Sequence, residues 1–94
     1  MFKYLNKVEK FIDALLQKYF PSEYEFTGAG KIIINRRCPD FTNVNGQKKV
    51  ILVNGLFWHT RNVFSKNEIE KNEIIPYQQF GFKVLHIWDD EIAT

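Results

Sequence analysis

The sequence predicts an α/β domain in which a small mixed β-sheet is flanked by helices. Three observations lead to this prediction: an amphipathic stripe near the start, a hairpin signal followed by an unbroken apolar run, and a second helical segment followed by another apolar run. A chain of 94 residues holds one domain. Its 45% hydrophobic and 26% charged residues are the balance of a globular domain and not of a disordered one.

The first element is predicted to be an amphipathic helix over about residues 3–19. Apolar residues recur there at spacings of three, four and one: Leu5, Val8, Phe11, Ile12, Leu15, Leu16 and Tyr19. Pro21 and Ser22 should end the helix. Residues 23–27 alternate polar and aromatic side chains, which predicts a strand, and residues 28–30 form a glycine-rich turn.

A hairpin is predicted in the middle of the chain. Residues 31–35 read as a short strand or an extended loop, and residues 41–44 as an extended segment. Asn45-Gly46 is the strongest two-residue hairpin signal in the chain. Residues 48–54 follow as a strand whose VILV run predicts burial on both faces.

The second half of the chain predicts a helix and a last strand. Ser65 and Glu68 have the spacing of a capping box, so a helix should begin there and run towards Phe80. Pro76 should kink or divide this helix. Residues 82–88, FKVLHIW, are predicted to form another buried strand.

Composition excludes several classes of protein. A net charge of +2 is too weak to imply nucleic-acid binding by itself, so a DNA-binding protein of this composition must use a local basic patch. The single cysteine, Cys38, excludes an internal disulfide and a zinc site built on several cysteines. No signal peptide and no run of 18 apolar residues is present, which predicts a cytoplasmic protein without membrane contact.

Asp40 and His59 are the first candidates for chemistry, because each lies at the end of a strand-like segment. Asp40 follows a proline, where an aspartate is commonly just a turn residue. His59 follows a Phe-Trp pair and is either a partly buried histidine that closes a turn, or a general base or electrostatic partner. Trp58 belongs to the core or stacks on bases.

Three glutamates and a set of basic residues are further candidates. Glu9 lies at the margin of the first apolar stripe, and Glu70 and Glu73 lie on the second helix; the structural alternative for all three is a solvated surface carboxylate. The basic residues form either a solvated loop or an edge that binds phosphate. The predicted DNA-binding residues are Lys31, Arg36, Arg37, Trp58 and Arg61.

The order of the motifs resembles one group of nucleases. The run C-P-D-F-x-x-V, a hairpin, K-x-V-I-x-V-x-G-x-F-W-H, a helix and G-F-K-V-L-x-I-W is similar to the very-short-patch-repair (Vsr-like) endonucleases and to the phage homing endonucleases of the EDxHD group. Both belong to the PD-(D/E)XK superfamily, and the resemblance extends over residues 8–92. It implies a restriction-endonuclease-like core and a Mg²⁺-dependent endodeoxyribonuclease, a hydrolase that cleaves phosphodiester bonds of double-stranded DNA, with Mn²⁺ as the alternative metal.

The resemblance also implies a role for individual residues. Glu9 matches the helix glutamate that lines the active site through water, and Asp40 matches the central metal-binding aspartate. Val53 matches the position whose backbone carbonyl binds the metal, and His59 matches the motif histidine. The final acidic residue lies eleven positions before the glycine of the last strand motif, which selects Glu70.

Departures from the family pattern favour one branch over the other. Leu52 stands where many superfamily members carry an acidic residue, which fits the EDxHD variant. Asn54 stands where the repair enzymes have a second histidine, and one cysteine is too few for their structural zinc site. We therefore expect the catalytic domain of a homing endonuclease, encoded by a phage with a mobile intron and acting in a bacterial host. A separate C-terminal DNA-recognition region should complete the protein and could support a homo-oligomer.

The sequence is also compatible with three other hypotheses about function. The first is a mismatch-repair-type nicking endonuclease, and the second is a non-catalytic DNA-binding domain on the same fold. The third is a protein-interaction module that presents an aromatic surface.

Overall fold

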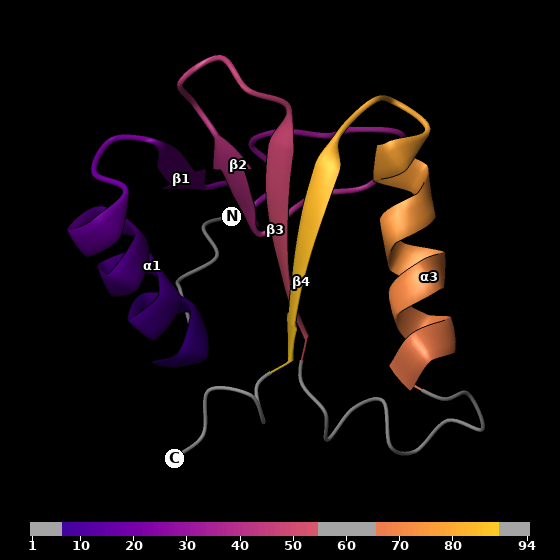
Figure 1. The fold of residues 1–94 in the computed structure, drawn as a ribbon, viewed down its shortest axis with the longest axis horizontal. Coiled ribbons are helices and arrows are strands. Elements are labelled where there is room, and N and C mark those ends of the chain that lie inside the picture. Colours follow the sequence, from indigo (N-terminus) through magenta and orange to yellow (C-terminus); the bar gives the residue numbers. More distant parts are fainter. Residues whose placement is uncertain (1–6, 55–65, 89–94) are drawn as a thin grey trace.

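The computed structural model describes residues 7–54 and 66–88. In chain order its elements are α1 (Lys7–Tyr19), β1 (Tyr24–Phe26), β2 (Phe41–Asn43), β3 (Lys49–Asn54), α3 (Lys66–Gln78) and β4 (Lys83–Trp88). The strands form one sheet in the order β1-β2-β3-β4 (Figure 1). The first two pairings are antiparallel, and the last is parallel, with α3 in the crossover. The predicted α/β class with a small mixed sheet is confirmed.

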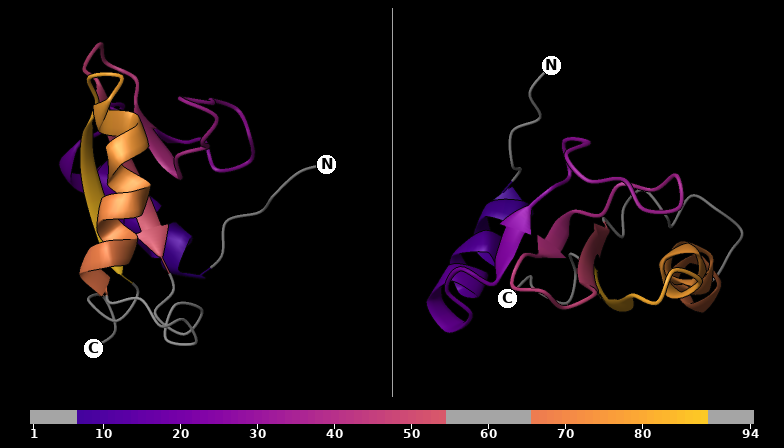
Figure 2. Two further views of the ribbon diagram at one scale, coloured as in Figure 1. Left: turned by 90° about the vertical axis from the view of Figure 1, so that its right-hand side faces the viewer. Right: turned by 90° about the horizontal axis from the view of Figure 1, so that it is seen from above.

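The two helices lie on either side of the sheet, as the view from above shows (Figure 2). The core between α1 and the sheet contains Ile12, Leu16, Phe41 and Ile51. The core between α3 and the sheet contains Ile34, Val50, Leu52 and Tyr77. Successive side chains of a strand point to opposite faces, so β3 contributes to both cores. The prediction that its apolar run is buried on both faces is confirmed.

Only half of the apolar stripe of α1 is buried. Ile12 and Leu16 are 4% and 8% exposed, whereas Phe11, Leu15 and Tyr19 are 49%, 40% and 63% exposed. The stripe consists of two adjacent rows at a spacing of four residues, and the sheet contacts one of them. The predicted amphipathic helix is confirmed over Lys7–Tyr19, with one of the two rows facing the core; its expected beginning near residue 3 lies outside the described residues.

The hairpin between β2 and β3 is present, but its loop is longer than the predicted two residues. Residues 44–48 connect the strands, with Gly46 at a φ of 97°. The side-chain Oδ1 of Asn43 accepts hydrogen bonds from the backbone N–H groups of Asn45 and Gln47, both at 3.0 Å. This side chain organises the longer loop in place of a two-residue turn. Residues 31–35 form a loop and not a strand, with turns and one isolated bridge, from Ile34 to Arg37.

Two predictions for the second half need correction. Pro76 does not divide α3, which is continuous from Lys66 to Gln78. Proline removes the one hydrogen bond that its N–H would donate to the carbonyl four residues earlier, and only two helical residues follow it. Strand β4 is only partly buried: Val84 packs against the core under α3 and Ile87 against the core under α1, while Leu85 is 56% exposed. β4 is the edge strand of the sheet. The predicted capping residue, Ser65, lies outside the described residues.

Candidate active site

Asp40 lies at the point where β2 and β3 diverge. The antiparallel register of the two strands ends at the pair Phe41 and Ile51. Beyond this pair a side chain takes the place of the backbone partner: Asp40 Oδ2 accepts a hydrogen bond of 2.8 Å from the backbone N–H of Val53. The Asp40 carbonyl accepts another 2.8 Å bond from the N–H of Thr27. A carboxylate held from two strands in this way has a fixed position.

Thr27 holds the segment around Asp40 through hydrogen bonds. It is completely buried, and its Oγ1 donates to the carbonyl of Pro39 at 2.9 Å or to Thr42 Oγ1 at 2.8 Å. The carbonyl of Thr27 accepts a bond from Cys38 Sγ. The segment that carries Asp40 is therefore anchored by hydrogen bonds on both sides of the aspartate.

We predict that Thr27→Val destabilises the protein by about 1–3 kcal/mol, because it leaves buried oxygens without their hydroxyl partner. Thr27→Ser keeps the hydroxyl and should retain most of the stability. Urea unfolding of both variants measures this difference. Equal losses in the two variants would show that the methyl group, and not the hydroxyl, matters.

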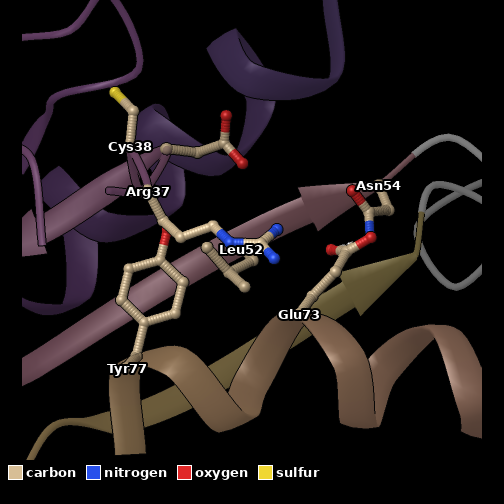
Figure 3. A pocket seen from close by; sticks show the side chains of 7 residues that line it. Arg37, Cys38, Leu52, Asn54, Glu73 and Tyr77 are labelled. Carbon is tan, nitrogen blue, oxygen red and sulfur yellow. Dashed lines mark hydrogen bonds between the residues drawn. The ribbon is translucent and has the colours of Figure 1, made fainter. Parts of the chain in front are cut away.

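A cavity of about 200 Å³ opens beside Asp40 on the face of the sheet that α3 covers (Figure 3). It is lined by Arg37, Cys38, Asp40, Leu52, Asn54, Glu73 and Tyr77. Two carboxylates, one guanidinium and one phenol thus surround a single space. Carboxylates suit a hard cation, and a guanidinium suits a phosphate.

Tyr77 contributes a hydroxyl that stays protonated. Its side chain rises from α3 toward the segment that carries Arg37 and Cys38 (Figure 3), and the residue is 2% exposed. Burial raises the pKa of Tyr77 to about 12, and the charges of Cys38 and Asp40 add to the rise. At neutral pH the hydroxyl is therefore a hydrogen-bond donor at the wall of the cavity.

The raised pKa of Tyr77 predicts a loss of stability in alkali. The folded state holds this proton more tightly than the unfolded state does, whose pKa is near 10. The resulting stabilisation is present below pH 10 and disappears as the pH rises through 12. Between these values the urea midpoint of the native protein should fall more steeply than that of Tyr77→Phe. Parallel curves would contradict the prediction.

A second group of polar side chains lies where the parallel strands β3 and β4 end. Asn54 closes β3, and its Nδ2 lies 2.5 Å from Glu73 Oε2 and 2.7 Å from His86 Nε2. His86 Nε2 is 3.2 Å from the same glutamate oxygen. Figure 3 shows Asn54 and Glu73 directed toward each other from β3 and α3. The carboxyl ends of the parallel strands β3 and β4 lie at the same edge of the sheet. Helix α3 connects the two strands and places Glu73 beside Asn54 of β3 and His86 of β4.

Glu70 has a different environment from Glu73. Trp88 Nε1 donates a hydrogen bond to Glu70 Oε1, which is also 3.9 Å from His86 Nδ1. Glu70 does not line the Asp40 cavity, whereas Glu73, one turn later, does. In the sequence Glu73 is one of several helix carboxylates, and the motif count selects Glu70 instead. Helix periodicity does not separate the two, since residues three apart share a helix face.

Glu9 is buried, with 3% of its surface exposed, in the first turn of α1. The alternative of a solvated surface carboxylate was wrong for this residue. A carboxylate near a helix N-terminus interacts favourably with the helix dipole, which offsets part of the cost of burial. Glu9 is not among the residues that line the Asp40 cavity.

The basic residues divide into two groups. Arg37 lines the cavity. Lys31 is exposed and forms an ion pair with Glu25, and Arg36 is exposed in a tight turn where it and Asn35 have φ values of 64° and 50°. Asn35 Nδ2 ties this turn to the end of α3 through the carbonyl of Pro76 at 2.8 Å. Three predicted site residues lie outside the described ranges: Trp58, His59 and Arg61.

Within residues 7–54 and 66–88, no three histidine, cysteine or acidic side chains are arranged to hold a metal ion. Mg²⁺ needs fewer protein ligands, since it keeps several waters and commonly binds one or two carboxylates together with phosphate oxygens. Asp40, one of the two carboxylates that line the cavity, fits this requirement.

Comparisons with protein-family models, with curated proteins and with solved structures gave no match. Among the helices of the described ranges, none has the length and apolar character needed to cross a membrane.

Proposed function

We propose that this chain is a metal-dependent endonuclease domain that hydrolyses phosphodiester bonds of double-stranded DNA. One observation carries the proposal: Asp40 is held where β2 and β3 diverge and lines a cavity together with Glu73 and Arg37. The mixed sheet between two helices agrees with the restriction-endonuclease-like core that the motif resemblance implies.

Mg²⁺ or Mn²⁺ would be held by the Asp40 carboxylate and by the carbonyl of Val53. In an extended strand the N–H and C=O of one residue point to the same edge. The N–H of Val53 donates to Asp40, so its carbonyl is directed to that edge of β3 as well. A bound divalent cation supplies Lewis acidity: it lowers the pKa of a water and neutralises charge on the phosphate.

The remaining residues would bind and orient the reactants. Arg37 would donate to phosphate oxygens from the wall of the cavity, and the protonated Tyr77 hydroxyl is a further donor. Glu73 would orient the attacking water. In the reaction the water oxygen bonds to phosphorus, one bond from phosphorus to a sugar oxygen breaks, and the proton that the water loses is matched by one that the leaving oxygen gains. His59, which lies outside the described residues, stays predicted either to accept the proton of the water or to stabilise the charge on the phosphate.

The homing type is favoured over mismatch repair by sequence features alone, the asparagine at position 54 and the single cysteine. We propose Mg²⁺ as the cofactor, duplex DNA as the partner, and a DNA-recognition region outside this domain.

Cleavage of a supercoiled plasmid tests the proposal. The native chain should nick it in Mg²⁺ or Mn²⁺ and not in EDTA, and both Asp40→Ala and His59→Ala should abolish the nicking. Asp13→Asn removes a carboxylate from α1, away from the cavity, and should leave activity unchanged. Metal-independent binding of the plasmid without any cleavage would favour the non-catalytic DNA-binding domain.

A further inference from the structure

His86 is a buried histidine beside the Asp40 cavity, and neither the sequence motifs nor the proposed chemistry uses it. It lies on β4, and its side chain is 3% exposed. Its register partner on β3 is Leu52, which lines the cavity. Burying an imidazole ring costs free energy for each ring nitrogen that forms no hydrogen bond.

His86 Nε2 lies close to Asn54 and Glu73 at the same time. The Nδ2 of Asn54 lies 2.7 Å from His86 Nε2 and 2.5 Å from Glu73 Oε2. An amide nitrogen only donates, so its two hydrogens can serve the histidine and the glutamate at once when Nε2 carries no proton. In this amide orientation Nε2 accepts, and Asn54 bridges two acceptors. The ring hydrogen is then on Nδ1, which has no hydrogen-bond partner among the described residues and lies 3.9 Å from Glu70 Oε1.

This bridge places Glu73. With His86 as the second acceptor, the Asn54 amide has one orientation, and its other hydrogen holds the Glu73 carboxylate at the wall of the cavity. Without Nε2 the amide is free to rotate, and the carboxylate loses its fixed partner. Residues that orient a ligand from behind change metal affinity or activity by about 10–100-fold when they are removed.

We infer that His86 is a positioning residue of the candidate site, which acts through Asn54 to hold Glu73 in place. The inference rests on the proposed function for its effect on cleavage. The position of the proton on the His86 ring is independent of that function and can be observed without metal or DNA.

Three substitutions in the full chain test the role of the Nε2 atom. Gln presents an amide oxygen near the Nε2 position and can accept from Asn54, whereas Asn is too short and Ala has no acceptor. We expect His86→Ala and His86→Asn to lower the single-turnover cleavage rate about 10–100-fold, with DNA affinity changed less than threefold. His86→Gln should recover to within about fivefold of the native rate, and Leu85→Ala, a change on the opposite face of the same strand, should match the native protein.

A double variant tests whether His86 acts through Glu73. If it does, His86→Ala should slow cleavage no further in a chain that already carries Glu73→Ala. Equal rates for His86→Gln and His86→Asn, or independent effects of the two alanine substitutions, would overturn the inference while leaving the proposed function intact.

Nitrogen NMR of the imidazole rings gives a readout that needs no activity. The chain has two histidines, so His59→Ala identifies the signals of His86. We expect an Nε2 that carries no proton and accepts a hydrogen bond, and a changed Nε2 signal in Asn54→Ala. A proton on Nε2 would overturn the inference. The expected tautomer in a chain that binds no metal and cleaves no DNA would instead support the bridge and overturn the proposed function.

Discussion

Asp40→Asn is expected to lower the single-turnover rate of DNA cleavage by about 10³-fold or more. Removing one group that stabilises transition-state charge already costs about 10²–10³-fold, and Asp40 is proposed to hold the metal directly. The amide oxygen can still accept the hydrogen bond from Val53 N–H, so the divergence of β2 and β3 should be preserved. The loss would then be one of charge and not of structure.

Thermal unfolding and DNA binding separate these explanations. The unfolding midpoint of Asp40→Asn should stay close to that of the native chain, and in EDTA its affinity for duplex DNA should be equal or higher, because a negative charge near the phosphates is gone. Cleavage that survives this substitution would contradict the proposed role of Asp40. A large fall in the unfolding midpoint would show that the amide does not reproduce the native contact.

Glu73→Gln is expected to have the second-largest effect, about a 10–100-fold fall in the cleavage rate. Glu73 lines the cavity, and the glutamine keeps its size while removing its charge. Glu70→Gln is the matched control on the same helix face. Its amide oxygen can still accept the hydrogen bond from Trp88, so its rate should stay within a few-fold of native.

The pair of variants also decides which glutamate the motif describes. Counting positions back from the last strand motif selects Glu70, whereas the geometry of the cavity selects Glu73. A larger loss in Glu70→Gln than in Glu73→Gln would support the count and would contradict the assignment of Glu73 to the site.

The fold could be predicted from patterns that act locally. The period of the apolar residues identifies α1, and the VILV run identifies a strand buried on both faces. The exposed half of the α1 stripe could not be predicted, because Phe11 and Ile12 are equally apolar. Which of them faces the sheet depends on where the helix packs.

The site was predictable only in part. Asp40 stands out because it follows a proline at the start of a hairpin arm, and the structure brings Arg37 to the same cavity. His86 lies within an apolar run, where a histidine gives no sign of its partners. Its contacts with Asn54 and Glu73 come from three elements distant in sequence, and only the parallel pairing of β3 with β4 brings them together.

The position of a bound cation tests the central claim most directly. Crystals of the chain grown with Mn²⁺ and short duplex DNA, measured at a wavelength where manganese scatters anomalously, would locate the ion. We expect an anomalous peak in the cavity beside the Asp40 carboxylate and the Val53 carbonyl, and its absence in Asp40→Asn crystals grown in the same way. A peak elsewhere on the chain, or one that persists in the variant, would contradict a metal-dependent nuclease site at Asp40.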